Sequence, residues 1–141
     1  MLNVLVVDDS VVMRKMVLRT LRMSGIPLGE IFEAANGEDG LAIIEREWVD
    51  LALIDLNMPV LDGQTMIERI RGSEANRDLA ILVVSTDTSP ARREALKDYR
   101  VSFVEKPFTP EQVRAEALRV TGLEMDDGVD REITAGVDYD F

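Results

Sequence analysis

The 141-residue sequence contains no cysteine and no histidine. Without cysteine, the chain can form no disulfide bond, no thiolate nucleophile and no zinc or iron–sulfur site held by sulfur. Without histidine, it lacks the commonest general base and the commonest ligand of transition metals in proteins. Any metal ion that these side chains bind must therefore be held by oxygen.

Basic residues are scarce relative to acidic ones, and long apolar runs are missing. The chain has 16 lysines and arginines against 27 aspartates and glutamates, a net charge of −11, and its pI is near 4.4. This charge disfavours nucleic acid and anionic membranes as ligands and favours cations or basic protein surfaces. The first apolar run meets Asp8 too soon for a signal peptide, and no run has membrane-spanning length. We therefore expect a cytoplasmic protein with no nucleic-acid or membrane partner.

Length and composition predict one folded domain with a tail. A chain of this size forms a single core by the usual size range of domains. Composition changes once, after Gly122: residues 123–141 contain seven acidic residues and one basic residue. We predict a folded domain over 1–122 and an acidic, flexible tail over 123–141. Because the tail ends in two aromatic residues among acids, Tyr139 and Phe141, we also predict that it tunes binding to a partner.

Short apolar runs alternate with longer amphipathic segments. The short runs are bounded by turn residues, as is typical of strands buried on both faces of a parallel sheet. We predict strands at Asn3–Val7, Ile31–Ala35, Leu51–Asp55, Leu79–Ser85 and Val101–Glu105. Helical spacing of apolar residues, with Ser89-Pro90 and Thr109-Pro110 as start signals, predicts helices over about 11–23, 37–48, 64–71, 91–98 and 110–121.

This alternation predicts an α/β fold, a doubly wound (βα)5 five-stranded parallel sheet with helices on both faces. We expect the flavodoxin-like strand order 2-1-3-4-5, in which the first and third strands are neighbours at the point where the order reverses. In such sheets, ligands bind outside the carboxyl ends of the strands.

Polar residues stand at those carboxyl ends. They are Asp8 and Asp9 after the first strand, Asp55 at the third, Ser85 at the fourth and Lys106 after the fifth. Three carboxylates close together need a cation, and oxygen ligands with room for water suit Mg²⁺. Mg²⁺ and a carboxylate nucleophile can accept a phosphoryl group, with an ammonium and a hydroxyl to bind its oxygens.

Each of these residues also has a simpler explanation. An Asp pair before a helix is most often a cap, and Asp55 and Ser85 at strand ends can serve as turn residues. Lys106 before a proline is usually solvated, and Phe103 alternates with Val101 as a strand core residue would. Their joint placement at the same ends of four strands favours a functional site.

The same segments carry a family resemblance. The matching motifs are Val7-Asp8-Asp9-Ser10, Asp55-Leu56-Asn57-Met58-Pro59, Asp62-Gly63, Ser85-Thr86 and Lys106-Pro107-Phe108. With them the chain resembles, over residues 3–122, the response-regulator receiver domain of bacterial two-component signalling. The Asp-Ser start and the Asn57–Pro59 turn are most similar to chemotaxis-type (CheY-like) single-domain members.

The resemblance implies roles for individual residues. Asp55 would be the phosphoacceptor; Asp9 would bind Mg²⁺ directly, Asp8 largely through water, and Asn57 through its backbone carbonyl. Lys106 would bind the phosphoryl group. This lysine precedes what is often a cis peptide at Pro107.

The resemblance also implies a switch. Ser85 and Phe103 would form the switch pair, with Ser85 drawn toward the phosphoryl group and the Phe103 ring filling the space released. The phosphoryl donor would be a phosphohistidine on a histidine kinase or phosphotransfer protein. A downstream protein would bind the face formed by the fourth helix, fifth strand and fifth helix. The chain would thus act as a switch and binding module, not as an enzyme.

Two other functions fit the same broad pattern. An Mg²⁺-dependent phosphohydrolase could also work through an aspartyl-phosphate, but haloacid-dehalogenase-like enzymes place a second Asp two residues after the nucleophile, where this chain has Asn57. A flavodoxin-like FMN carrier needs a phosphate-binding loop after the first strand, where Asp8 and Asp9 would repel phosphate. The chain departs from the receiver pattern in the glycine-free, shorter segment 97–101, which leaves the geometry of the fourth helix and its following loop open.

Overall fold

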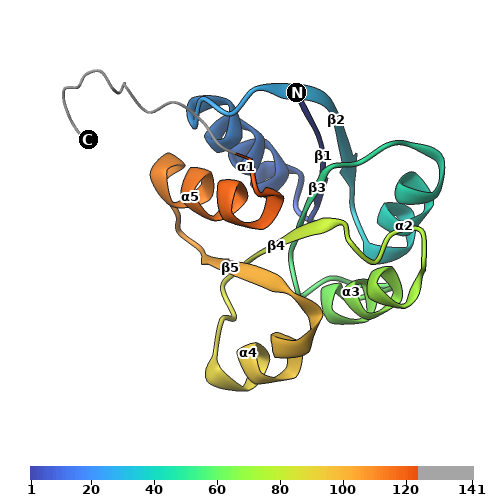
Figure 1. Cartoon of the computed structure of the whole chain (residues 1–141). Coiled ribbons are helices and arrows are strands. Elements are labelled where there is room, and N and C mark those ends of the chain that lie inside the picture. Colours follow the sequence, from blue (N-terminus) through green and yellow to red (C-terminus); the bar gives the residue numbers. More distant parts are fainter. Residues whose placement is uncertain (124–141) are drawn as a thin grey trace.

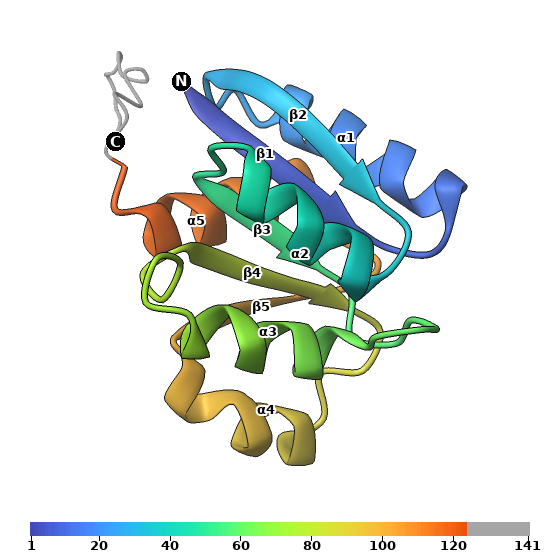
Figure 2. The ribbon, with the colours of Figure 1, turned by 90° about the vertical axis from the view of Figure 1, so that its right-hand side faces the viewer.

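Five parallel strands form the central layer of the computed structural model, which describes residues 1–123 (Figure 1). The strands are β1 (Leu2–Val7), β2 (Leu28–Ala34), β3 (Leu51–Ile54), β4 (Ala80–Ser85) and β5 (Val101–Glu105). Their order is β2-β1-β3-β4-β5, and every neighbouring pair is parallel. The predicted fold class and strand order are therefore confirmed. In Figure 2 the strand arrows point to one edge of the sheet, where the carboxyl ends gather.

Helices cover both faces of the sheet (Figure 1). They are α1 (Val11–Met23), α2 (Gly37–Arg46), α3 (Gly63–Gly72), α4 (Pro90–Leu96) and α5 (Pro110–Thr121). Residues of β1 alternate between the two faces: Val4 and Val6 pack with α1 and α5, whereas Leu5 and Val7 pack in the cluster that includes residues of α2, α3 and α4. This double burial explains why the strands are continuous apolar runs in the sequence.

Each α-helix begins directly after a residue whose side chain accepts a hydrogen bond from the backbone of the first turn. These caps are Ser10, Asn36, Asp62, Ser89 and Thr109. Such a cap satisfies one of the backbone N–H groups that a helix start leaves without a partner. The predicted starts at Ser89-Pro90 and Thr109-Pro110 are confirmed, and Asn36 caps α2.

The start of β2 was predicted wrongly. We expected the strand from Ile31, but it begins at Leu28. The register between β1 and β2 shifts between Leu2 and Val4, and the Asn3 side chain accepts a hydrogen bond from the Glu30 N–H at 2.9 Å. The Asn3 side chain thus replaces part of the backbone ladder at the start of β2. Residues 28–30 therefore show no apolar alternation from which the strand could be predicted.

The connection from α4 to β5 closes without glycine. A 3₁₀ helix, Lys97–Tyr99, follows α4, so the predicted end at 98 falls within it. Arg100 then has a φ of 57°, a left-handed conformation that is uncommon outside glycine. Arg71, in the last turn of α3, stabilises the chain around Arg100 by hydrogen bonds. Its guanidinium donates to the carbonyls of Leu79 (2.6 Å), Tyr99 (2.7 Å), Arg77 (3.1 Å) and Arg100 (3.1 Å).

Trp48 lies near the amino ends of the strands, at the edge of the sheet opposite their carboxyl ends, and its side chain is exposed. Its indole N–H donates to Asp50 at 2.9 Å, and its carbonyl accepts from the Asn3 side chain at 3.0 Å. Gly122, in a left-handed conformation, ends α5. No helix within residues 1–123 is long and apolar enough to cross a membrane. Most of the predicted tail, residues 124–141, lies outside the described residues.

Candidate functional site

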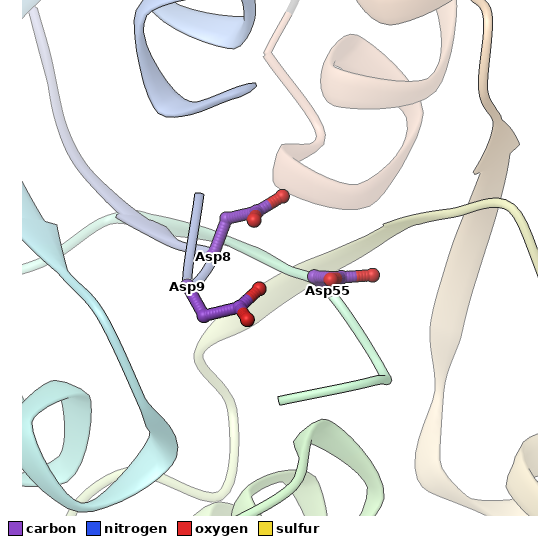
Figure 3. Close-up of side chains that lie close together, drawn as sticks. All are labelled: Asp8, Asp9 and Asp55. Carbon is purple, nitrogen blue, oxygen red and sulfur yellow. The ribbon is translucent and has the colours of Figure 1, made fainter. Parts of the chain in front are cut away.

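Three carboxylates meet at the carboxyl edge of the sheet (Figure 3). Asp8 and Asp9 follow β1, and Asp55 follows β3, whose neighbour is β1; the Asp55 N–H donates to the Val7 carbonyl at 3.0 Å. One carboxylate oxygen from each of the three lies within 4.8 Å of the others. Asp8 and Asp55 are buried, while Asp9 is exposed. The cluster therefore has a buried floor and one side open to solvent.

Lys106 is the cation of this cluster. Its ammonium Nζ lies 2.9 Å from Asp8 Oδ2 and 3.7 Å from Asp55 Oδ1, and only 8% of its side chain is exposed. The residue directly follows β5, its N–H donates to the Ser85 carbonyl at 3.0 Å, and its peptide bond to Pro107 is cis, as the resemblance implied. Three ionised carboxylates and one ammonium leave a charge of about −2, which one divalent cation would neutralise.

Burial raises the pKa of the Asp55 carboxyl above its ordinary value. Lys106 opposes this shift, the Asp8 carboxylate adds to it by repulsion, and hydrogen bonds from the Ser85 side chain and the Asn57 backbone oppose it. The raised pKa means that the metal-free folded protein holds a proton on Asp55 more tightly than the unfolded chain does. Ionised Asp55 therefore destabilises the metal-free fold.

This sign gives a pH-dependent prediction for metal-free protein. Above the raised pKa of Asp55 the penalty is fully present, and it disappears as pH falls through that pKa toward the ordinary value of 3.8. In EDTA, Asp55→Asn should therefore melt at a higher temperature than the parent at pH 7, and the difference should shrink on acidification. Melting curves of both proteins between pH 4 and pH 7 test this; a difference that grows toward low pH would contradict it.

The remaining predicted residues lie at different distances from the acidic cluster. Ser85 ends β4 and is fully buried, and its side chain opposes the rise that burial causes in the pKa of the Asp55 carboxyl. Asn57, two residues after Asp55, is exposed. Phe103 pairs with Val83 in the sheet and packs partly buried at the edge of the core. The structure thus brings Asp8, Asp9, Asp55, Ser85 and Lys106 together, with Asn57 beside them and Phe103 within β5, three residues before Lys106.

The structure gives two residues of this region, Gly63 and Arg92, roles that the sequence did not reveal. A Cβ on Gly63 would collide with the Asp55 carbonyl oxygen, so the loop after Asp55 needs glycine there. Arg92, on α4, reaches the Asn57 side chain with its guanidinium. A helix arginine after a cap is ordinary in sequence, and only the fold places it over this loop.

A family model described as the response regulator receiver domain matches residues 4–118. The chain belongs to this family. A chemotaxis protein CheY homolog of Campylobacter jejuni is 30% identical over 129 residues, which cover 90% of this chain and 98% of that protein. The chain also matches longer curated proteins, of which it spans about a third of the length. The match to CheY homologues supports a CheY-like receiver domain.

Solved structures show the same similarity. The chemotaxis protein CheY4 of Vibrio cholerae is 34% identical, with a TM-score of 0.75, and the match covers 85% of this chain and 98% of that one. The receiver domain of sensor histidine kinase PA1611 from Pseudomonas aeruginosa, solved with a magnesium ion coordinated in the active site cleft, is 25% identical with the same TM-score of 0.75; the match covers 86% and 98%.

The family decides between the functions that the sequence left open. A receiver domain is a phosphorylation-activated signalling switch, and the CheY homologues agree with this reading. The phosphohydrolase alternative is not favoured by these matches. The acidic cluster of this receiver domain is compatible with Mg²⁺.

Proposed function

We propose that this receiver domain accepts a phosphoryl group on Asp55 from a phosphohistidine of a histidine kinase or phosphotransfer protein. The carrying observation is the buried contact of Lys106 with Asp8 and Asp55 inside the acidic cluster. An Asp55 oxygen would form the new bond to phosphorus while the bond from phosphorus to the donor nitrogen breaks. Lys106 is placed to bind a phosphoryl oxygen, and the Ser85 hydroxyl another. The test is whether uptake of one phosphoryl group depends on Asp55.

The donor set fits Mg²⁺. Its ligands would be carboxylate oxygens of Asp9 and Asp55 and the backbone carbonyl of Asn57, with Asp8 acting largely through water and the open side at Asp9 leaving room for water. A bound Mg²⁺ would supply positive charge for the acidic residues and the transferring phosphoryl group. Lys106, itself paired with Asp8, would hold the acceptor carboxylate in place for that transfer.

Mg²⁺ should stabilise the folded protein, because the ion binds only where the three carboxylates are assembled. At free Mg²⁺ about ten times its dissociation constant, the gain is about 1.4 kcal/mol, or roughly 5 °C in Tm. Asp9→Ala should lose most of this response. Glu45→Ala, which removes an exposed charge from α2 beside the opposite sheet edge, should keep it. Equal Tm in EDTA and in millimolar Mg²⁺ for the parent would show that the metal site is wrong.

We propose that Ser85 and Phe103 transmit the phosphorylation of Asp55 to a partner-binding face. Phosphorylation would draw the Ser85 hydroxyl toward the phosphoryl group, and the Phe103 ring would change position with it. Phe103 and Gln112 line a groove of about 440 Å³ between β5 and α5. A downstream protein would bind the face formed by α4, β5 and α5 and sense the change there.

We also propose a cytoplasmic location for the protein and a division of its chain into two functional parts. A cytoplasmic location would suit a phosphorylated kinase as donor, and the net charge of −11 argues against nucleic acid or membrane as a partner. We propose that residues 1–122 act as the receiver unit, and that the acidic segment 123–141 tunes partner binding. The chain works as a switch and binding module whose only chemistry is its own phosphorylation and dephosphorylation.

A further inference from the structure

One arginine joins three segments around the acceptor. Arg92 is the third residue of α4, and its side chain is 29% exposed. Its guanidinium donates from Nε to Asp87 Oδ2 at 3.0 Å, from one terminal nitrogen to Gln64 Oε1 at 2.8 Å, and from the other to Asn57 Oδ1 at 3.3 Å. Asn57 lies two residues after Asp55. The side chain thus ties α4 to α3, to the loop after Asp55 and to the loop after Ser85.

The contact with Asp87 reaches Ser85 directly. The Asp87 N–H donates to the Ser85 hydroxyl oxygen at 3.2 Å, while the Asp87 carboxylate is held by Arg92. The hydrogen bond from Arg92, and next that from Ser89, lowers the pKa of Asp87. The carboxylate therefore stays ionised and paired at neutral pH. A movement of the Ser85 hydroxyl toward a phosphoryl group on Asp55 would therefore break its hydrogen bond from Asp87 unless this loop moves with it.

The next residue adds a second tie between α4 and the switch pair. Arg93 Nε donates to the Thr88 carbonyl at 3.0 Å, and its guanidinium carbon lies 4.7 Å from the centre of the Phe103 ring. Two consecutive arginines therefore attach α4 to the loop that follows Ser85 and to Phe103. A change in the position of Ser85 or Phe103 would therefore alter the contacts that these two arginines of α4 make.

We propose that Arg92 is a positioning residue for phosphorylation: it holds the loop after Ser85 and the Asn57 side chain in the unphosphorylated arrangement, and so opposes the phosphorylated one. The inference rests on the proposed function of Asp55. A phosphoryl group shifts the equilibrium only by its differential affinity for the two arrangements. The contacts of Arg92 with Asp87 and Asn57 must be broken to reach the phosphorylated arrangement. The free energy that this costs reduces the affinity for the phosphoryl group.

The test uses beryllofluoride with Mg²⁺ as a mimic of the phosphoryl group on the full chain. Half-saturation is measured from the backbone NMR signals of Ser85 and Gly63. Arg92→Ala should bind about two- to fivefold more tightly than the parent, as expected for loss of a partly exposed charged contact. A gain in binding cannot come from a damaged fold, so a lower Tm of the variant would not explain it. Unchanged or weaker binding overturns the proposal.

Two controls sharpen the result. Lys97→Ala removes a cation just after α4 that pairs with Glu94, and it should bind like the parent. If Arg92 acts through the loop after Ser85, its effect should shrink when Asp87→Ala is already present. A full gain in that background overturns the proposed route. A parent protein that does not respond to beryllofluoride overturns the proposed function as well, whereas equal responses of parent and Arg92→Ala overturn only the role of Arg92.

Discussion

Acetyl phosphate with Mg²⁺ should add one phosphoryl group to the parent protein and none to Asp55→Asn. Asp55 is the buried carboxylate that lies beside both Lys106 and Asp8, so a phosphoryl group on it would meet a cation at once. The asparagine amide has the same shape but is no nucleophile for phosphorus. Intact mass measured with and without EDTA gives the result directly, since labelling should require the divalent cation.

A matched carboxylate separates this chemistry from nonspecific phosphorylation of exposed carboxylates. Asp78 is an exposed residue with an ion pair to Arg100 at 3.3 Å, far from the acidic cluster in the fold. Asp78→Asn should therefore label like the parent. Equal labelling of Asp55→Asn and the parent would remove Asp55 as the acceptor, and labelling that ignores EDTA would remove the role of the metal.

Arg71→Ala should lower the Tm by roughly 10 °C, a large stability effect for a charged residue outside the site. Its guanidinium satisfies four backbone carbonyls from the loops before β4 and before β5. Burial, and next the nearby Arg100, lowers the pKa of Arg71 to about 10, so the side chain is still charged at neutral pH. Removing it leaves the partly buried carbonyls of Leu79 and Tyr99 and two exposed carbonyls without this donor, at about 3 kcal/mol.

The control for Arg71 is Arg69, an exposed residue of the same helix. Arg69→Ala should change stability by about 0.5 kcal/mol or less. Arg71→Lys keeps the charge but not the planar fork, so it should restore only part of the lost Tm. A melting curve of Arg71→Ala close to that of the parent would show that the four hydrogen bonds do not stabilise the turn at Arg100.

The elements that the sequence predicted well are those with local signals. Helix starts follow from caps such as Ser89, whose hydroxyl bonds within its own first turn. Strands follow from apolar runs because both faces of the sheet are covered. The start of β2 lacked such a signal, since the side chain of Asn3, from a strand distant in sequence, supports it.

The site could be predicted to the extent that topology alone brings residues together. Asp8, Asp55 and Lys106 converge because parallel strands end at one edge. The bridge from Arg92 to Asn57 depends on how α4 packs, which no local pattern encodes. Val60, with a φ of 71° in the loop after Asp55, is another case, because valine gives no sequence signal for a left-handed conformation.

The position of Trp48 decides how this protein can be studied optically. It is the chain's one tryptophan, and it sits with 77% of its surface exposed at the sheet edge opposite the acidic cluster. Intrinsic emission therefore samples solvent and the Asp50 contact, and it carries no direct readout of metal or phosphoryl binding. The absence of cysteine turns this into an advantage. A single cysteine introduced at Val12, an exposed position in the first turn of α1, would give a dye one attachment point three residues from Asp9.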